Sequence, residues 1–226
     1  MATSGTFAFS PEVAEICDEA FERLGLDTSD LTARHLKSAR RSIDFMFSEW
    51  TNKGVHQWAV DQQNQTLVDG TATYNAPSGT VAILEMVVRR GGIDIPVNPM
   101  TRDEYLAIPS KTAEGLPNRY YFDRSRTTPT ITLWNTPENS TDAIYYYRMR
   151  ALQDVGVASN TLDIPPRWHE AVAAGLASKL AVKYAPDRIG PLTGLAAARF
   201  AEATQEDRER SPTTLRVKYN VGLRKR

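Results

Sequence analysis

Apolar residues recur every three or four positions at both ends of this chain, whereas short apolar runs separated by turn residues fill its middle. The clearest helical spacing lies in residues 31–50. Its apolar residues are Leu36, Ala39, Ile43, Met46, Phe47 and Trp50. The opposite side holds Arg34, Lys37, Arg41, Asp44 and Ser48. This pattern predicts an amphipathic helix with one buried stripe and one solvated, basic face, which Gly54 ends.

Three further segments carry helical signals. The first covers residues 11–25, with Ser10 as the expected N-cap and a proline at the first helical position. The second covers residues 167–185 and follows a pair of prolines, and the third runs over about residues 190–210. Because the loop between the last two segments is short, we expect these helices to pack as an antiparallel pair.

The middle of the chain is rich in β-branched and aromatic residues between turn signals, which is typical of short strands. The predicted strands cover residues 55–61, 80–90, 119–124, 130–134 and 143–152. Gly91-Gly92 between two apolar runs indicates a hairpin. A short helix is expected over residues 102–108, because Thr101 and Glu104 form a capping box and a proline follows.

The order helices, strands, helices predicts an α+β fold. Its simplest form is a helical bundle built from residues 1–54 and 165–210, with an antiparallel β domain, residues 55–164, inserted between them. Residues 211–226 form a separate C-terminal tail in this scheme.

Composition then narrows the class of protein. A hydrophobic content of 41% and a charged content of 24% are ordinary for a soluble globular protein. No stretch approaches the roughly 20 apolar residues of a membrane span, and the N-terminus lacks the features of a secretory signal. We therefore expect no membrane partner. The single cysteine, Cys17, lies on an apolar helix face and is expected to be a buried thiol.

The formal net charge of zero conceals an asymmetry. The tail, residues 211–226, has five basic side chains and no acid, which leaves 22 basic and 27 acidic side chains in the rest of the chain. An acidic body with a basic tail suggests that the tail docks on a negative partner, although such a tail also serves simply to solubilise a protein.

No catalytic or metal-binding pattern stands out. The three histidines, His35, His56 and His169, fall in three different predicted elements with no second ligand at metal spacing. The motifs of nucleophile elbows, dinucleotide folds and Walker loops are absent from the sequence. We therefore predict no catalytic residue, no metal and no cofactor, and a protein that is not an enzyme.

Residues 115–152 are both aromatic and rich in arginine, a composition found at the centres of protein interfaces. The candidate inter-subunit residues are Tyr105, Arg124, Arg126, Trp134, Tyr146, Arg148, Arg150 and Arg167. Core packing of the inward-facing aromatics is the plainer alternative. A platform for single-stranded nucleic acid would use similar residues, but the acidic body disfavours it.

Several segments, in this order, resemble the head-to-tail adaptor proteins (tail accessory factors) of short-tailed bacteriophages. They are SARRSIDFMFSEW, NKGVHQWAVD, VDGTATYNAP, RDEYLAIPSKTAEGLPNRYYFDR, TITLWNTP, YYYRMRALQDVG, LDIPPRWHEAVAAGLASKLAVKYAPDR and EDRERS. The resemblance implies a structural virion protein that forms a ring of about twelve copies between the portal and the tail nozzle. Genomic DNA passes through the lumen of such a ring. The protein is expected in the virion neck, and in the host cytoplasm before assembly.

The resemblance also implies that the C-terminal tail reaches the portal. The portal-docking candidates are Leu215, Arg216, Val217, Lys218, Tyr219, Leu223, Arg224, Lys225 and Arg226. Their alternation of apolar and basic residues suits an added strand or a groove between portal subunits, ordered only on docking. Two alternatives stay open: a peptidoglycan hydrolase on the same scaffold, and a tube or nozzle component that does not touch the portal.

Overall fold

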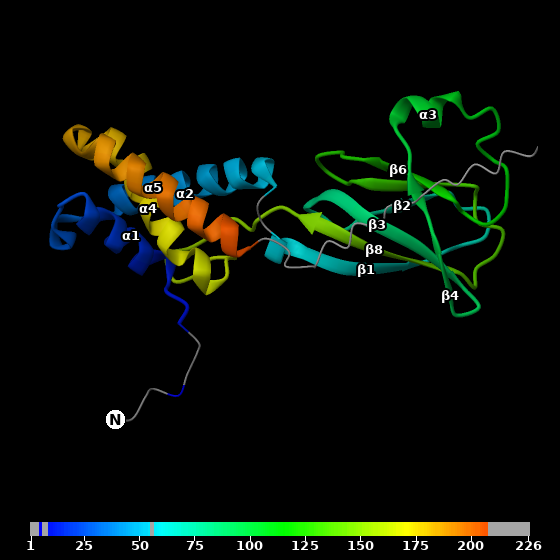
Figure 1. Ribbon diagram of the computed structural model, residues 1–226, viewed down its shortest axis with the longest axis horizontal. Coiled ribbons are helices and arrows are strands. Elements are labelled where there is room, and N and C mark those ends of the chain that lie inside the picture. Colours follow the sequence, from blue (N-terminus) through cyan, green and yellow to red (C-terminus); the bar gives the residue numbers. More distant parts are fainter. Residues whose placement is uncertain (1–4, 6–8, 55–56, 208–226) are drawn as a thin grey trace, which may run out of the picture.

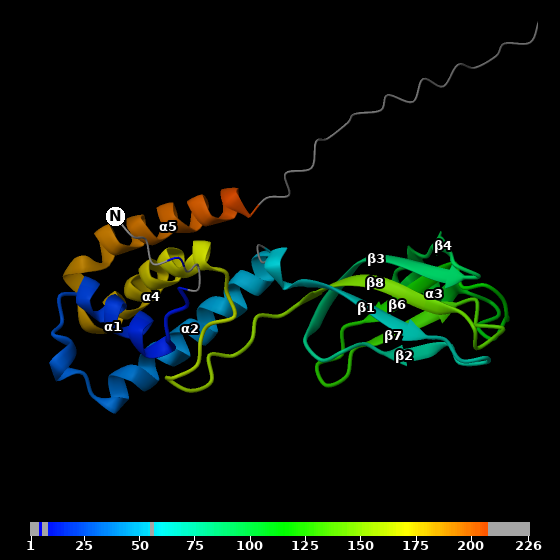
Figure 2. The same ribbon diagram turned by 90° about the horizontal axis from the view of Figure 1, so that it is seen from below.

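The computed structural model of this chain describes residues 5, 9–54 and 57–207. Helices and strands separate into two lobes along the long axis of the molecule, as Figures 1 and 2 show. Helices from both ends of the chain make one lobe, and all the strands with one short helix make the other. The predicted α+β class is confirmed.

The helical lobe is built around a central helix. The helices of the chain are α1 (Val13–Arg23), α2 (Ala33–Lys53), α3 (Arg102–Ala107), α4 (His169–Tyr184) and α5 (Ile189–Glu206). Helix α4 packs against α1, α2 and α5. Four consecutive residues of α4, Ala171, Val172, Ala173 and Ala174, are buried, so this part of the helix is covered on every side.

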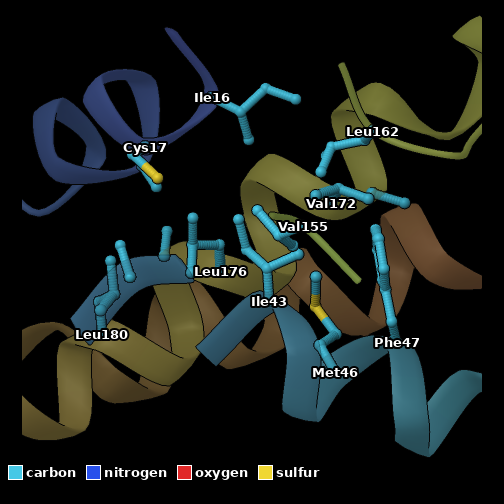
Figure 3. Packing of buried hydrophobic residues seen from close by; sticks show 14 of the residues in the cluster. Ile16, Cys17, Ile43, Met46, Phe47, Val155, Leu162, Val172, Leu176 and Leu180 are labelled. Atoms are coloured by element: carbon cyan, nitrogen blue, oxygen red, sulfur yellow. The ribbon is translucent and has the colours of Figure 1, made fainter. Parts of the chain in front are cut away.

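Buried side chains from α1, α2 and α4 meet in one cluster. Figure 3 shows Cys17 of α1 and Ile43 of α2 directed into the same core, with Leu176 of α4 between them. The approach of α2 to α4 is close, since a Cβ added at Gly175 would lie 2.6 Å from the sulfur of Met46. Burial of such apolar side chains is the main stabilising term of a fold of this kind.

An aromatic cluster closes the end of the helical lobe that faces the sheets. Trp168 is fully buried, and the centroid of its ring lies 5.0 Å from that of Trp50, 4.9 Å from that of Trp58 and 5.7 Å from that of Phe200. These residues come from α2, α5 and two 3-10 turns, Gln57–Ala59 and Pro166–Trp168. The cluster therefore joins segments that are far apart in the sequence.

The expected N-cap of α1 is wrong. The helix begins at Val13 and its N-cap is Glu12, which forms a capping box with Glu15. The backbone N–H of Glu12 donates to the Glu15 carboxylate at 2.8 Å, so Ser10 is not needed to cap the helix. The other predicted helix ends agree closely: Gly54 caps α2 in the left-handed conformation, and Thr101 with Glu104 caps α3.

The sheet lobe consists of two packed sheets. The strands are β1 (Val60–Thr66), β2 (Thr73–Asn75), β3 (Thr80–Arg90), β4 (Ile93–Pro96), β5 (Asn98–Pro99), β6 (Arg119–Asp123), β7 (Thr130–Trp134) and β8 (Ala143–Arg150). One sheet has the order β1-β8-β3-β4, and the other has the order β2-β7-β6-β5. Every strand pair of the described chain is antiparallel except β5 with β6. Their shared core includes Leu67, Val88, Ile131, Leu133 and Ile144.

The first predicted strand is displaced. It was expected over residues 55–61, but β1 covers Val60–Thr66, which reads VDQQNQT. This strand has little apolar character because it is an edge strand, held by backbone pairing with β8 from Val60↔Met149 to Thr66↔Ala143. The hairpin at Gly91-Gly92 is confirmed between β3 and β4.

Candidate interaction surfaces

Arg148, one of the candidate inter-subunit residues, lies inside the sheet lobe. It is only 8% exposed, and its Nε and Nη2 donate to the two carboxylate oxygens of Asp61 at 2.7 and 3.0 Å. Its Nη1 donates to Thr80 Oγ1 at 3.0 Å and to the carbonyl oxygens of Pro77 and Ser78. These bonds tie β8 to β1 and to the turn before β3, so the guanidinium is fully used within the chain.

The side chain of Tyr146, like that of Arg148, points into the sheet lobe. It is 3% exposed and belongs to the core between the two sheets, as does Ile144 two residues earlier. Because side chains alternate along a strand, Tyr145 and Tyr147 face the other way, and Tyr147 is exposed. The even-numbered positions of β8 therefore face the interior, and the apolar Ile144 in the sequence was the signal for that phase.

Two further candidate arginines form ion pairs close to the helical lobe. Arg150 pairs with Asp163, whose backbone carbonyl accepts a hydrogen bond from Trp58 Nε1 at 3.0 Å. Arg167 pairs with Asp207, a carboxylate that is itself buried. Both arginines thus stabilise contacts within one chain, whatever else they touch.

The remaining candidates lie nearer the surface. Arg124 and Arg126 are exposed, and Tyr105 and Trp134 are half-buried. The ring of Tyr105 stacks on Tyr121 with 5.5 Å between centroids, which connects α3 to β6. The portal-docking candidates, Leu215 to Arg226, lie outside the described residues.

Among the residues described, no group of three or more histidine, cysteine, aspartate or glutamate side chains has the arrangement of a metal site. In that same part of the chain no helix combines the length and apolar character needed to span a membrane. Cys17 is buried, and burial raises the pKa of its thiol to about 12. The thiol is therefore protonated at neutral pH and is not activated as a nucleophile.

The Arg148–Asp61 pair predicts a pH dependence of stability. The pKa of the Asp61 carboxyl is held below its ordinary value of 3.8, chiefly by the hydrogen bonds from Arg148. The pair therefore stabilises the fold above that ordinary value, and the contribution is lost as the pH falls through the lower pKa of the folded state. We expect the urea midpoint to decrease below about pH 4, and Asp61→Asn to remove part of that decrease. Urea unfolding at a series of pH values measures the midpoints of the natural chain and of the variant. The same decrease of the midpoint with falling pH in both proteins would contradict the prediction.

Sequence reasoning missed an apolar surface on the helical lobe. Phe45 of α2 and Val182 of α4 are each 65% exposed and line one groove between their helices. Phe45 directly precedes Met46 and Phe47 of the predicted core stripe but is not part of that stripe. Its position on the helical wheel, on the same side as Lys37 and Arg41, is the signal that marks it as exposed.

The fold and these surfaces define the class: an α+β protein with a helical lobe and a sheet lobe. Arg148, Arg150 and Arg167 form ion pairs within the chain. Other side chains, such as Phe45 and Arg124, are exposed at its surface. A comparison with protein families then identifies the family of this chain. The family model described as SU10 adaptor protein matches residues 11–218, nearly the whole chain, and the protein belongs to that family. It is a structural adaptor protein of bacteriophages, which confirms the resemblance seen in the sequence. No curated protein sequence matches it.

Proposed function

We propose that this protein is the head-to-tail adaptor that docks under the portal and connects the capsid to the tail. The observation that carries the proposal is the family match over residues 11–218. The order of landmark segments in the sequence agrees with it. In the proposed assembly about twelve copies form a ring, as a closed set of heterologous contacts allows.

Each part of the chain has a place in this proposal. The helical part, residues 1–54 and 165–210, forms the wall of the ring, and the β part, residues 55–164, extends from it toward the tail nozzle. DNA passes through the lumen without a specific contact. An acidic body supports this, because residues 1–210 carry 22 basic and 27 acidic side chains and repel phosphates.

The basic tail, residues 211–226, is proposed to dock on the portal. Its five basic side chains and no acid would meet a negative surface, and its alternating apolar residues would lie along a groove. The protein would accumulate in the host cytoplasm and enter the virion neck when the portal is present. No catalytic step is part of this proposal.

Light scattering tests the proposal directly. The mass of the protein is measured alone and then with a purified portal ring from the same phage, using the full chain and a variant that ends at residue 210. We expect the full chain to bind at one copy per portal subunit and the shortened chain to bind weakly. Failure of both forms to bind would overturn the proposal. Equal binding by the two forms would overturn the docking role of the tail but not the adaptor function. Clearing of cell wall in a zymogram would favour a hydrolase.

A further inference from the structure

The groove between α2 and α4 combines apolar and basic side chains. Phe45 and Val182 are exposed at this groove, and Arg41, Lys179 and Lys183 line it with them. We call these five residues the basic apolar patch. Exposed apolar side chains rimmed by charge are typical of surfaces that bind another protein, since a nucleic acid backbone gains little from them.

The positive charges of this patch are poorly compensated within the chain. Neither Arg41 nor Lys183 has an ion-pair partner among the described residues, and Lys183 donates only to the hydroxyls of Ser38 and Ser42, at 3.1 and 2.7 Å. Burial lowers the pKa of the Lys183 ammonium, and the charges of Arg41 and Lys179 lower it further. Only Lys179 meets a carboxylate, that of Glu49 at 3.2 Å. An acidic partner would compensate this cluster.

A second surface of the same lobe has the opposite character. Helix α1 contains four acidic residues and a single basic one, Arg23. Between α1 and α4 lies a hollow of about 360 Å³ whose apolar lining includes Phe9, Ile16 and Ala173. Its charged lining consists of Glu15, Glu19, Glu170 and Arg23; Arg23 pairs with Glu19 and with Glu170, so three acidic side chains face one basic side chain and the lining keeps an excess of negative charge. Phe9 is itself exposed, so this acidic hollow offers both apolar contact and negative charge.

The two surfaces lie on opposite sides of α4. Tyr184 faces α1, since its ring centroid lies 5.8 Å from that of Phe21, and Glu170 pairs with Arg23 of α1 at 2.7 Å. Val182 is two residues from Tyr184, which places the two side chains about 160° apart around the helix axis. Figure 3 agrees in placing α1 and α2 on different sides of the core.

We propose that the basic apolar patch of one copy docks in the acidic hollow of the next copy and so forms the contact between neighbouring subunits of the ring. This rests on the proposed function, because a ring needs two different and complementary faces on each subunit. Different faces on opposite sides of one lobe let each copy bind two neighbours. The charge complementarity also orients the copies head to tail and disfavours pairing of two like faces.

Charge reversal on each surface tests this contact. Lys37, one turn before Arg41 on α2, extends the positive charge of the patch, and the variant Lys37→Glu/Arg41→Glu places two negative charges beside the remaining Lys179 and Lys183, so this side loses its net positive charge. The variant Glu19→Lys/Glu22→Lys changes Glu19 of the hollow and Glu22, which lies three residues further along α1, so the net charge of α1 changes from negative to positive. Self-association is measured by sedimentation, alone at high concentration and on a purified portal ring. Each variant alone should associate at least about 100-fold more weakly than the natural chain, and an equal mixture of the two should recover, because unlike copies then alternate.

Controls separate this contact from folding and from portal docking. Arg102→Glu, the same substitution at an exposed arginine of α3, should leave association unchanged, and urea unfolding should show that all variants fold. Variants that associate, and load the portal ring, in the same number of copies as the natural chain would overturn the contact but not the adaptor function. Loss of binding to labelled double-stranded DNA with association intact would assign the patch to DNA and also overturn it. No portal binding by the natural chain would overturn both proposals.

Discussion

Replacement of Arg148 by methionine is expected to lower the free energy of unfolding by about 3 kcal/mol. The substitution keeps most of the buried stem but leaves the Asp61 carboxylate, Thr80 Oγ1 and two carbonyl oxygens without their donor. The side chain of Asp61 is 38% exposed, so water solvates it again and limits the loss. Urea unfolding followed by circular dichroism measures the change.

Two companion variants sharpen this prediction. Arg148→Lys keeps the charge but cannot donate to both oxygens of Asp61 and to Thr80 together, so it should lose an intermediate amount of stability. Arg124→Ala, at an exposed arginine, should not change the unfolding midpoint. If Arg148→Met instead unfolded like the natural chain and lost only self-association, Arg148 would act between subunits, as its sequence context suggested.

Replacement of Trp168 by alanine is expected to lower the free energy of unfolding by about 4 kcal/mol. Its side chain is completely buried and contacts the rings of Trp50, Trp58 and Phe200. These rings come from three separate segments of the chain, which cannot all move inward to fill the cavity. The same urea measurement applies, and tryptophan fluorescence reports on the neighbouring rings.

A matched variant tests whether volume or the indole N–H matters. The Nε1 of Trp168 is buried without a hydrogen-bond partner among the described residues, so Trp168→Phe removes an unpaired donor together with part of the ring. This variant should therefore lose less than half as much stability as the alanine variant. Equal losses for the two variants would mean that the indole N–H makes a bond that the structure does not show.

The helices of this protein were predictable because their signals are local. A capping box, a glycine in the left-handed conformation and apolar spacing of three and four residues mark α2 and α3 within a few positions. Strands β3 and β7 match the predicted ranges because most of their residues are apolar or β-branched. Strand β1 does not match, because backbone pairing with β8 rather than side-chain burial holds it.

The interaction surfaces were less predictable because they depend on distant partners. The sequence alone does not show that Arg148 pairs with Asp61, which lies 87 residues earlier in the chain. The arginine therefore looked available to another subunit. The apolar spacing places Phe45 outside the stripe that contains Met46, but it could not show that Val182, from a distant helix, lies in the same groove. The phase of β8 was within reach, because Ile144 fixes which alternate residues point inward.

The connection between the two lobes has a mechanical consequence. Strands β1 and β8, paired over seven residues, lie side by side where they approach the helical lobe (Figure 2). Arg148–Asp61 and Arg150–Asp163 fasten this end of the pair. A single strand would act as a swivel, whereas two paired strands resist torsion. A torque on the helices would therefore turn the sheets with them, so a subunit of this design transmits rotational position from one level of an assembly to the next.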